Sequence, residues 1–164
     1  MNPKTPAFRV GTGYDVHRIV SGRRLVLGGI EFDVEFGLEG HSDADVLTHA
    51  LADAILGAAG LPDIGAFFPP SDPQFKGMDS QIILRKARDE ARSRGWTIAN
   101  LDATLIAEAP KIGPHLDTMK SRLAQTLEVE PDQIGLKATT NEKLGWIGRG
   151  EGMAAQASCL LQKA

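Results

Sequence analysis

The spacing of apolar residues along this 164-residue chain switches several times between two periods. Side chains alternate across a strand and recur about every 3.6 residues around a helix, so the period distinguishes the two elements. Helical spacing predicts helices over about 42–60, 80–94 and 114–127. Alternating or short apolar runs between glycines and polar residues predict strands over 8–17, 25–27, 30–34, 97–107, 133–140 and 152–161.

The order of these elements predicts an α+β fold in one domain, 1–164, with residues 1–7 as a flexible N-terminus. We expect a mixed four-stranded main sheet with helices packed on one face, plus a small β-hairpin formed by the two short early strands. Ser42 is a favourable N-cap for the first helix, and Asp45 lies three places on, as in a capping box. The segment 61–80 contains four prolines and three phenylalanines, which predicts an ordered, functional loop.

The composition is that of a globular chain. Apolar residues make up 42 %, which is enough for a core and too much for a disordered chain. The net charge is -3 and no run of basic residues could follow a phosphate backbone, so we expect no nucleic-acid partner. No stretch approaches about 20 apolar residues, and Met1–Phe8 lacks the apolar run of a signal peptide, so we expect no membrane association and a cytoplasmic location. Cys159, the only cysteine, lies in an apolar run and is interpreted as a core residue.

Three of the four histidines fall between residues 17 and 49. Asp15 and His17 are two places apart on an expected strand, so both side chains point to one face. His49 lies on the next helix, one turn from Asp45 and one turn from Asp53, which could orient its ring. One carboxylate and two imidazoles suit Zn²⁺ and leave a fourth position open for a substrate. Ordinary surface hydrogen bonds would explain the same spacing, and spacing alone does not decide between the two.

Candidate phosphate-binding features lie before the first helix and in the last third of the chain. His41 precedes a helix N-terminus, where backbone amides favour an anion, although a turn with a capping serine is the simpler interpretation. The run 137–143 follows a strand and contains two threonines and Glu142, which would suit Mg²⁺ beside phosphate oxygens. The loop 107–111 could wrap a base or ribose. The glycine-rich run 145–152 matches neither a P-loop nor a dinucleotide fingerprint, and a surface turn with an Arg–Glu pair is its simpler interpretation.

Taken together and in this order, these segments resemble the 2-C-methyl-D-erythritol 2,4-cyclodiphosphate synthase family of the non-mevalonate isoprenoid pathway. The resemblance covers nearly the whole chain after Phe8. Each motif is weak alone, whereas the ordered set is specific. The matching stretches are Gly11–His17, His41–His49, Asp63–Gly65, Phe68–Asp72, Phe75–Gly77, Ala109–Lys111 and Lys137–Gly152.

The resemblance implies two metal sites, two catalytic side chains and an extended substrate pocket. His41 and Thr140 would be catalytic, because they would steady the reacting phosphoryl groups. The metal ligands would be Asp15, His17 and His49 for Zn²⁺, and Glu142, with substrate phosphates, for Mg²⁺ or Mn²⁺. The substrate would contact Asp15, His17, His41, Ser42, Asp63, Ile64, Gly65, Phe68, Asp72, Ala107, Pro110, Lys111, Gly113, Ala138, Thr139, Thr140, Glu142, Trp146 and Arg149.

The same resemblance implies an activity and an assembly. The substrate would be 4-diphosphocytidyl-2-C-methyl-D-erythritol 2-phosphate, and the products would be the 2,4-cyclodiphosphate and CMP. The chain would form a homotrimer with active sites between subunits, so that motifs from both ends of a small chain meet. Two alternatives stay open: a zinc-dependent phosphohydrolase that releases an open phosphate, and a metal-stabilised trimeric binding protein. The binding protein would need a fourth zinc ligand, for which His115 is the only spare histidine.

Three positions depart from the usual pattern of that family. Asn141 stands where threonine is usual, Trp146 where phenylalanine is frequent, and Gly113 where a larger apolar residue is common. None of these changes removes an expected metal ligand, so they bear on the shape of the pocket.

Overall fold

The computed structural model describes residues 6–164 and is built around a five-stranded mixed sheet. The strand order is β4-β1-β7-β5-β6, in which β5 and β6 are parallel and the other neighbours are antiparallel. A separate pair, β2 and β3, forms a hairpin. The strands are β1 (Phe8–Ser21), β2 (Leu25–Leu27), β3 (Ile30–Phe32), β4 (Phe36–Leu38), β5 (Trp96–Ile106), β6 (Ile134–Thr139) and β7 (Gly152–Lys163).

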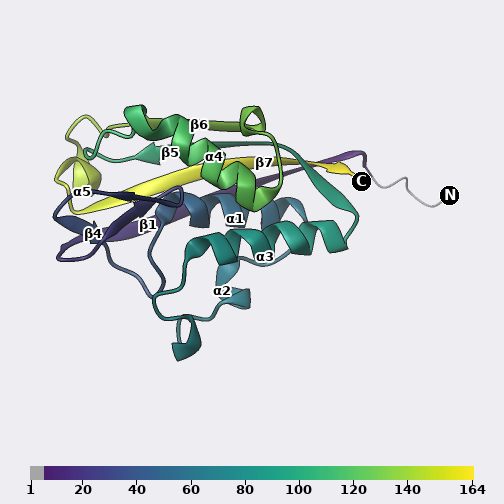
Figure 1. Cartoon of the computed structure of the whole chain (residues 1–164), viewed down its shortest axis with the longest axis horizontal. Helices are drawn as coiled ribbons and strands as arrows, with labels where there is room; N and C mark the ends of the chain where they lie inside the picture. The colour runs from purple at the N-terminus through teal and green to yellow at the C-terminus, as the bar shows by residue number, and fades with distance from the viewer. Residues whose placement is uncertain (1–5) are drawn as a thin grey trace.

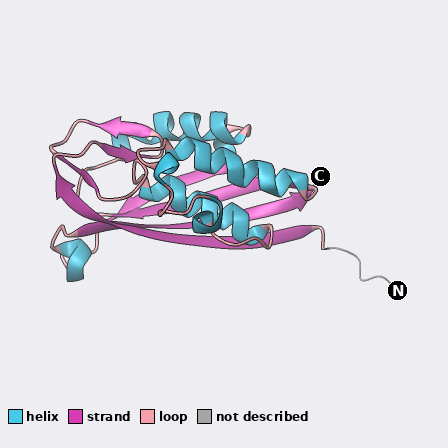
Figure 2. Ribbon diagram, turned by 90° about the horizontal axis from the view of Figure 1, so that it is seen from below, coloured by secondary structure: helices cyan, strands magenta, loops and turns pink. Residues whose placement is uncertain are grey.

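Three longer helices lie over one face of the sheet (Figure 1, Figure 2). The helix α1 packs on β1 and β7, α3 packs beside α1, and α4 packs beside α3. Two short helices, α2 and α5, lie in the connections. The helices are α1 (Val46–Ala58), α2 (Ile64–Phe67), α3 (Ser80–Ser93), α4 (Leu116–Leu127) and α5 (Gly145–Gly148), with 3-10 turns at Pro73–Phe75, Gly113–His115 and Pro131–Gln133.

Two glycines of β1 allow α1 to approach the backbone of the sheet. A Cβ atom on Gly11 would lie 2.2 Å from the carbonyl oxygen of Ala54, and one on Gly13 would lie 2.0 Å from that of Ala50. Both alanines are fully buried. Small side chains at this contact let a core with few aromatic residues reach a high packing density. The close approach also brings His49 of α1 within reach of β1.

Figure 2 shows the long helices on one side of the sheet. The face of β1 that α1 does not cover carries exposed apolar side chains. Val10, Tyr14 and Val16 lie on this face together with Thr12 and are 72 %, 59 % and 44 % exposed. Several exposed apolar side chains on one face are typical of a contact surface for another molecule. This outer face of β1 is therefore a candidate subunit interface.

The sheet has one strand more than the expected four. The additional strand, β4, is three residues long and pairs with Ile19–Ser21 at the end of β1. Such a short run carries no readable period, which is why it is absent from the prediction. The strand β1 also extends beyond residue 17, to Ser21. The mixed α+β class, the hairpin and the helices on one face agree with the expectation.

The first helix begins at Val46 rather than at Ser42, so the predicted capping box is wrong. The N-cap is Asp45, whose carboxylate accepts the Thr48 amide at 3.0 Å. Ala44 has a φ of 57°, a left-handed conformation that a helix cannot include. The Ser42 hydroxyl instead accepts the Ala44 amide in the turn before the helix.

The expected flexible terminus, 1–7, falls mainly on residues 1–5, which lie outside the described residues. Ala7, just before β1, lies beside the last residue of β7, because its carbonyl accepts the Lys163 amide at 3.0 Å. Within residues 6–164, no helix combines the length and the apolar character needed to cross a membrane.

Candidate active site

The elements β1 and α1 bring the three predicted zinc ligands to one point. Asp15 and His17 lie on the face of β1 that α1 covers, and His49 lies on α1. Asp15 Oδ2 is 2.8 Å from His17 Nε2 and 3.0 Å from His49 Nδ1, and the two ring nitrogens are 3.2 Å apart. Ligands in a tetrahedron with bonds of about 2.0–2.1 Å lie roughly 3.3 Å apart. The three atoms match one face of such a tetrahedron, so the predicted convergence is confirmed.

A metal ligand must offer an unprotonated ring nitrogen, and both rings are oriented to offer one to a bound metal. His17 Nδ1 lies 2.7 Å from the Glu39 carbonyl oxygen, which can only accept, so Nδ1 carries a proton and Nε2 is the nitrogen that a metal would bind. His49 Nε2 lies 2.7 Å from Ser80 Oγ and 3.2 Å from Ser42 Oγ. The cluster therefore fits a divalent metal ion with three protein ligands and one open position.

In the metal-free cluster, Asp15 and His17 alter each other's pKa. Burial opposes ionisation of Asp15, but hydrogen bonds with His17 and His49 outweigh it and lower the pKa of Asp15 from 3.8 to about 2. Burial also disfavours the charged form of His17, yet its hydrogen bond to Asp15 raises the pKa of the ring above 6.5. The ionised carboxylate supplies negative charge for a bound cation, and that cation must displace the proton that the raised pKa places on His17.

Asp45 and Asp53 do not orient His49, contrary to the expectation from their spacing. Asp45 is fully buried, and its two oxygens accept the amides of Gly28 and Gly29 at 2.9 and 2.7 Å. The Asp53 carboxylate accepts a backbone amide at the start of α2. Residues four apart share a helix face, but both carboxylates accept hydrogen bonds from backbone amides of neighbouring segments rather than from His49.

The side chain that contacts the outer nitrogen of His49 most closely is Ser80, which spacing does not reveal. Its hydroxyl donates to Asp43, and the second oxygen of Asp43 accepts the Ser80 amide at 2.9 Å. Ser80 follows His49 by 31 positions and is expected from the sequence only as the start of a helix. The packing of α3 against α1 creates the contact, and no local pattern indicates it.

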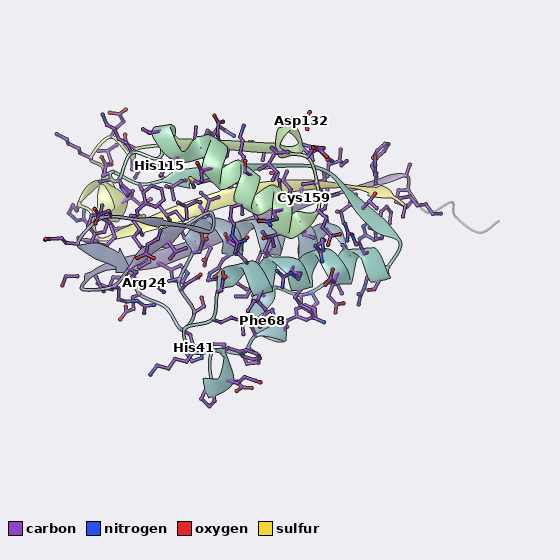
Figure 3. All side chains as sticks on the ribbon, viewed as in Figure 1. Arg24, His41, Phe68, His115, Asp132 and Cys159 are labelled. Atoms are coloured by element: carbon purple, nitrogen blue, oxygen red, sulfur yellow. The ribbon has the colours of Figure 1, made fainter. Side chains whose placement is uncertain are left out.

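The open side of the cluster faces a cavity of about 220 Å³. His41 and Ser42 extend its polar end, and His41 Nε2 lies 2.9 Å from the Asp72 carbonyl oxygen, which accepts from it. Figure 3 shows His41 and Phe68 on the same side of the molecule, near the loop that follows α2. The other wall is mostly apolar and comprises Ile64, Gly65, Phe68, Pro70, Phe75, Met78 and Ile83.

Two predicted acidic residues, Asp63 and Asp72, are not among the residues that line this cavity, although each lies within two positions of one that does. Asp63 is exposed directly before α2, and its carboxylate makes no capping hydrogen bond. The Asp72 carboxylate accepts the amide of Gln74 at 3.0 Å and so holds a 3-10 turn. Asp63 is therefore the better placed of the two to bind a ligand hydroxyl.

A second group of predicted residues gathers at the carboxyl ends of β5 and β6. Parallel pairing places Ile106 beside Thr139, and the Ala107 amide donates to the Thr139 carbonyl at 3.0 Å. Glu142 follows in a left-handed conformation with a φ of 50°, and its amide donates to the Thr140 hydroxyl. The group comprises Ala107, Pro110, Lys111, Gly113, Ala138, Thr139, Thr140 and Glu142.

The turn that carries Glu142 is held by Glu108, a residue that spacing does not single out. The Glu108 carboxylate accepts the amides of Asn141 and Lys143 at 2.9 and 3.3 Å. The Asn141 side chain donates to the Leu144 carbonyl at 2.9 Å. The asparagine that departs from the family pattern thus stabilises the turn through a contact of its own.

The metal cluster and the second group lie at the same end of the sheet but on different strands. β1 and β6 are separated by β7 and β5. Neighbouring strands are about 4.8 Å apart, so about 14 Å separates the two groups along the sheet. No residue of the second group lines the cavity beside the metal cluster. Within the described part of the chain, one copy does not unite the two groups in a single pocket.

Trp146 and Arg149 line neither the cavity beside the metal cluster nor the group around Glu142. Trp146 lines a separate shallow hollow that also touches His17. Arg149 donates to Glu151 at 2.7 Å on the surface, as in the simpler interpretation of the glycine-rich run, although this run contains a short helix. The spare histidine, His115, packs edge-on against a phenylalanine of β3 with ring centroids 4.9 Å apart, away from the metal cluster.

A three-ligand metal centre that opens onto a cavity at one end of a mixed α+β sheet defines the class of a metalloenzyme. The chain belongs to the YgbB family, whose model matches residues 8–162. A curated 2-C-methyl-D-erythritol 2,4-cyclodiphosphate synthase from Synechococcus elongatus is 60 % identical over 154 residues, which cover 94 % of this chain and 96 % of the relative. A protein of the same name from Nostoc sp. is 55 % identical over 157 residues, which cover 96 % and 95 %.

Solved structures share the fold. The bifunctional IspDF from Campylobacter jejuni superimposes with a TM-score of 0.93 at 44 % identity, over 96 % of this chain and 42 % of that one. IspF of Plasmodium falciparum, solved as a CDP complex, gives a TM-score of 0.86 at 34 % identity, over 98 % of this chain and 99 % of that one. These similarities confirm the family resemblance found in the sequence.

Proposed function

We propose that this chain converts 4-diphosphocytidyl-2-C-methyl-D-erythritol 2-phosphate into 2-C-methyl-D-erythritol 2,4-cyclodiphosphate and CMP, in the non-mevalonate pathway to isoprenoid precursors. The observation that carries this function is the convergence of Asp15, His17 and His49 beside a cavity, in a member of the YgbB family. Relatives that are 55–60 % identical over nearly the whole chain carry the name of this synthase. The activity is that of a phosphorus–oxygen lyase.

The reaction is an intramolecular displacement at phosphorus. An oxygen of the 2-phosphate forms a bond to the β-phosphorus, the bond from that phosphorus to the bridging oxygen breaks, and CMP leaves with that oxygen. A phosphate oxygen is already an anion near neutral pH, so no side chain has to remove a proton, and no covalent enzyme intermediate is needed. The obstacles are charge repulsion and orientation. Holding both groups in one site can supply roughly 7–11 kcal/mol of the barrier.

The metal at Asp15, His17 and His49 is Zn²⁺ in this proposal, because one carboxylate and two imidazoles with an open position suit that ion. Zinc bound there would supply positive charge to a phosphate oxygen in the open position. Glu142 would hold Mg²⁺ or Mn²⁺ together with phosphate oxygens. His41 and Thr140 would act on the phosphoryl groups directly, since each offers a hydrogen-bond donor to an oxygen that gains charge.

The remaining contacts divide between the two ends of the substrate. Asp63, with Ile64 and Gly65, would bind the erythritol hydroxyls, which its exposed and uncapped carboxylate supports. The loop Phe68–Asp72 would close over the substrate, because it borders the cavity and is tied to His41. The cytidine and its phosphates would be held by Ala107, Pro110, Lys111, Gly113, Ala138 and Thr139, while Ser42, Trp146 and Arg149 would also contact the substrate.

The proposed assembly is a homotrimer with active sites between neighbouring subunits. Two observations support it. The metal cluster and the group around Glu142 lie about 14 Å apart in one copy and share no cavity lining, which is consistent with a site that a neighbouring copy completes. The apolar row of Val10, Tyr14 and Val16 is exposed in one copy and would be buried in an assembly. The proposed location is the cytoplasm, where the single thiol of Cys159 stays reduced.

Product analysis tests this function against the phosphohydrolase. The protein is incubated with the diphosphocytidyl substrate, Zn²⁺ and Mg²⁺, and both CMP and inorganic phosphate are measured. We expect one CMP for each substrate consumed and no inorganic phosphate. His49→Ala should lower the rate by about 100-fold or more, because the substrate loses its alignment. Release of inorganic phosphate would support the hydrolase, and absence of any turnover in a folded, zinc-loaded protein would support the binding protein.

A further inference from the structure

Ser80 and Asp43 form a hydrogen-bonded chain behind the metal-facing side of His49. Ser80 is the first residue of α3, is fully buried, and places its hydroxyl oxygen 2.7 Å from His49 Nε2. The metal-facing nitrogen of the same ring is Nδ1, which lies beside Asp15 and His17. The ring thus joins the metal cluster on one side to the N-terminus of α3 on the other.

The hydrogen atoms of this chain can be assigned from its donors and acceptors. Asp43 Oδ1 accepts the Asp45 amide at 3.1 Å and the Ser80 hydroxyl, and Asp43 Oδ2 accepts the Ser80 amide at 2.9 Å. A carboxylate that receives donors on both oxygens acts as an acceptor only. A serine hydroxyl has one hydrogen, and here it points to Asp43. The Ser80 oxygen can therefore only accept from His49, so the proton of the ring is on Nε2.

Proceeding from the metal site of the proposed function, we propose that Asp43 and Ser80 are positioning residues that hold His49 in the tautomer whose Nδ1 lone pair binds the metal. They act through His49 and touch neither substrate nor metal. For His17, the backbone carbonyl of Glu39 accepts the Nδ1 proton and so holds the tautomer, and no side-chain substitution removes that carbonyl. His49 is therefore the ligand whose tautomer depends on side chains.

A secondary acceptor limits the size of the effect. Ser42 Oγ lies 3.2 Å from His49 Nε2 and already accepts the Ala44 amide. When Ser80 is truncated, the Ser42 oxygen can still accept the Nε2 proton of His49, although at a longer distance than the Ser80 oxygen. Loss of an outer partner of a metal-bound histidine commonly weakens metal binding by 10–100-fold. We expect Ser80→Ala to fall in the lower part of that range.

Asp43→Asn distinguishes proton placement from simple packing. The amide of asparagine can donate to the Ser80 oxygen, which turns the serine hydrogen toward His49 Nε2 and favours the tautomer that carries its proton on Nδ1. We expect this nearly isosteric change to weaken zinc binding by about 10–100-fold. Ser80→Thr keeps the hydroxyl and should stay within about threefold of the unsubstituted protein.

The experiment is a zinc titration of the full-length protein in competition with a chromogenic chelator, which needs no substrate. Thr126→Val is the matched control, because Thr126 is also a buried hydroxyl that donates to a side chain, at 2.6 Å from Gln81. Its removal should lower stability without changing the zinc dissociation constant by more than about twofold. Unchanged zinc affinity in both Ser80→Ala and Asp43→Asn would overturn the inference.

A second measurement does not depend on any variant folding. The ¹⁵N chemical shifts of the His49 ring in the zinc-loaded protein report which nitrogen binds the metal and which carries the proton. We expect the metal on Nδ1 and the proton on Nε2, and the opposite result would overturn the inference. Zinc binding that depends on Ser80 in a protein that forms no cyclic product would leave this inference standing and reject the proposed function instead.

Discussion

The chemistry proposed for this protein depends on three lone pairs, those of Asp15 Oδ2, His17 Nε2 and His49 Nδ1, which lie within 3.2 Å of one another. Groups behind the rings determine which nitrogen carries a proton, and these groups are a backbone carbonyl for His17 and the Ser80 hydroxyl for His49. A substitution of a side chain behind these rings therefore changes metal affinity by changing which ring nitrogen carries the proton, while the fold stays the same.

Stabilisation of the protein by zinc should increase with pH, because protons compete for the same lone pairs. Although burial disfavours the charged ring, the hydrogen bond to Asp15 raises the pKa of His17 above 6.5 in the metal-free protein. A protonated His17 therefore adds stability to the metal-free protein below pH 6.5, and this stability is lost as the pH rises through the raised pKa. Zinc must displace that proton, so the increase in unfolding free energy caused by zinc grows by up to about 1.4 kcal/mol per pH unit for each proton displaced. Denaturant unfolding with and without zinc, from about pH 5.5 to 8.5, measures this increase. An increase that does not depend on pH would refute the linkage.

Cys159 should be unreactive in the folded protein. Burial in the core raises the pKa of its thiol to about 12, so almost no thiolate is present near pH 8. A coloured thiol reagent should label it only after denaturant is added, at the rate of unfolding. Rapid and complete labelling under native conditions would show that the side chain is not buried as described.

Local spacing predicts the metal ligands but not the residues that hold them. Asp15 and His17 are two apart on a strand, so the period of two is enough to place them on one face. Ser80 reaches His49 only because α3 packs on α1, and that contact joins residues 31 positions apart. Asp45 is expected beside His49, yet the hairpin turn at Gly28-Gly29 engages its carboxylate.

At the scale of elements, the contact between β1 and α1 sets the geometry of the metal cluster. Two ligands belong to the strand and one to the helix, so the distance between the backbones decides whether the three atoms meet. Gly11 and Gly13 allow that distance to be short.

Gly13→Ala should therefore destabilise the protein and weaken zinc binding together. The added methyl would lie 2.0 Å from the Ala50 carbonyl oxygen, and a helix backbone cannot move aside as a flexible side chain can. Overpacking of this kind costs about 1–3 kcal/mol or more. Urea unfolding and a zinc titration measure the two effects.

Gly57→Ala is the matched control for that substitution. Gly57 lies in α1 and faces β1, but its added methyl would meet only the Thr12 carbonyl oxygen, at an ordinary 3.6 Å. Alanine is favoured over glycine inside a helix, so stability should stay equal or rise by up to about 1 kcal/mol. If both variants unfold at the same urea concentration, close packing at Gly13 does not determine the distance between β1 and α1.

Element type is predictable here wherever the period extends over several turns or alternations. The helix α3 begins at the predicted Ser80, and β5 and β7 lie within two residues of their predicted bounds. The strand β4 has too few residues to show a period. The start of α1 depends on a left-handed residue, Ala44, and alanine gives no sequence signal for that conformation.

At the scale of the whole molecule, the two groups of proposed site residues lie at one end of the sheet and three strands apart. The composition, poor in aromatic residues, is consistent with the alanine- and leucine-rich core. The proposal that a second copy completes the site could not be derived from spacing, because it rests on the distance between strand ends in the folded chain. In the sequence it rests on the family resemblance alone.

Val10→Lys should dissociate the proposed trimer into monomers of 17.6 kDa. Val10 is 72 % exposed in one copy and lies in the apolar row of β1, so a charge there would be buried at the interface without a partner. Ile82→Lys is the control, because Ile82 is an apolar residue that is 46 % exposed on α3, away from that row. Sedimentation velocity should show a trimer for the control and a monomer for Val10→Lys. A monomeric unsubstituted protein, or a trimeric Val10→Lys, would contradict the proposed interface.

The most direct test of the proposed function is a ³¹P NMR time course with the diphosphocytidyl substrate, Zn²⁺ and Mg²⁺, run beside His49→Ala. A coupled pair of signals from a cyclic diphosphate should grow together with the signal of CMP. His49→Ala should leave the substrate spectrum unchanged over the same period. Growth of an inorganic phosphate signal without the coupled pair, or an unchanged spectrum with the folded, zinc-loaded protein, would contradict the cyclisation.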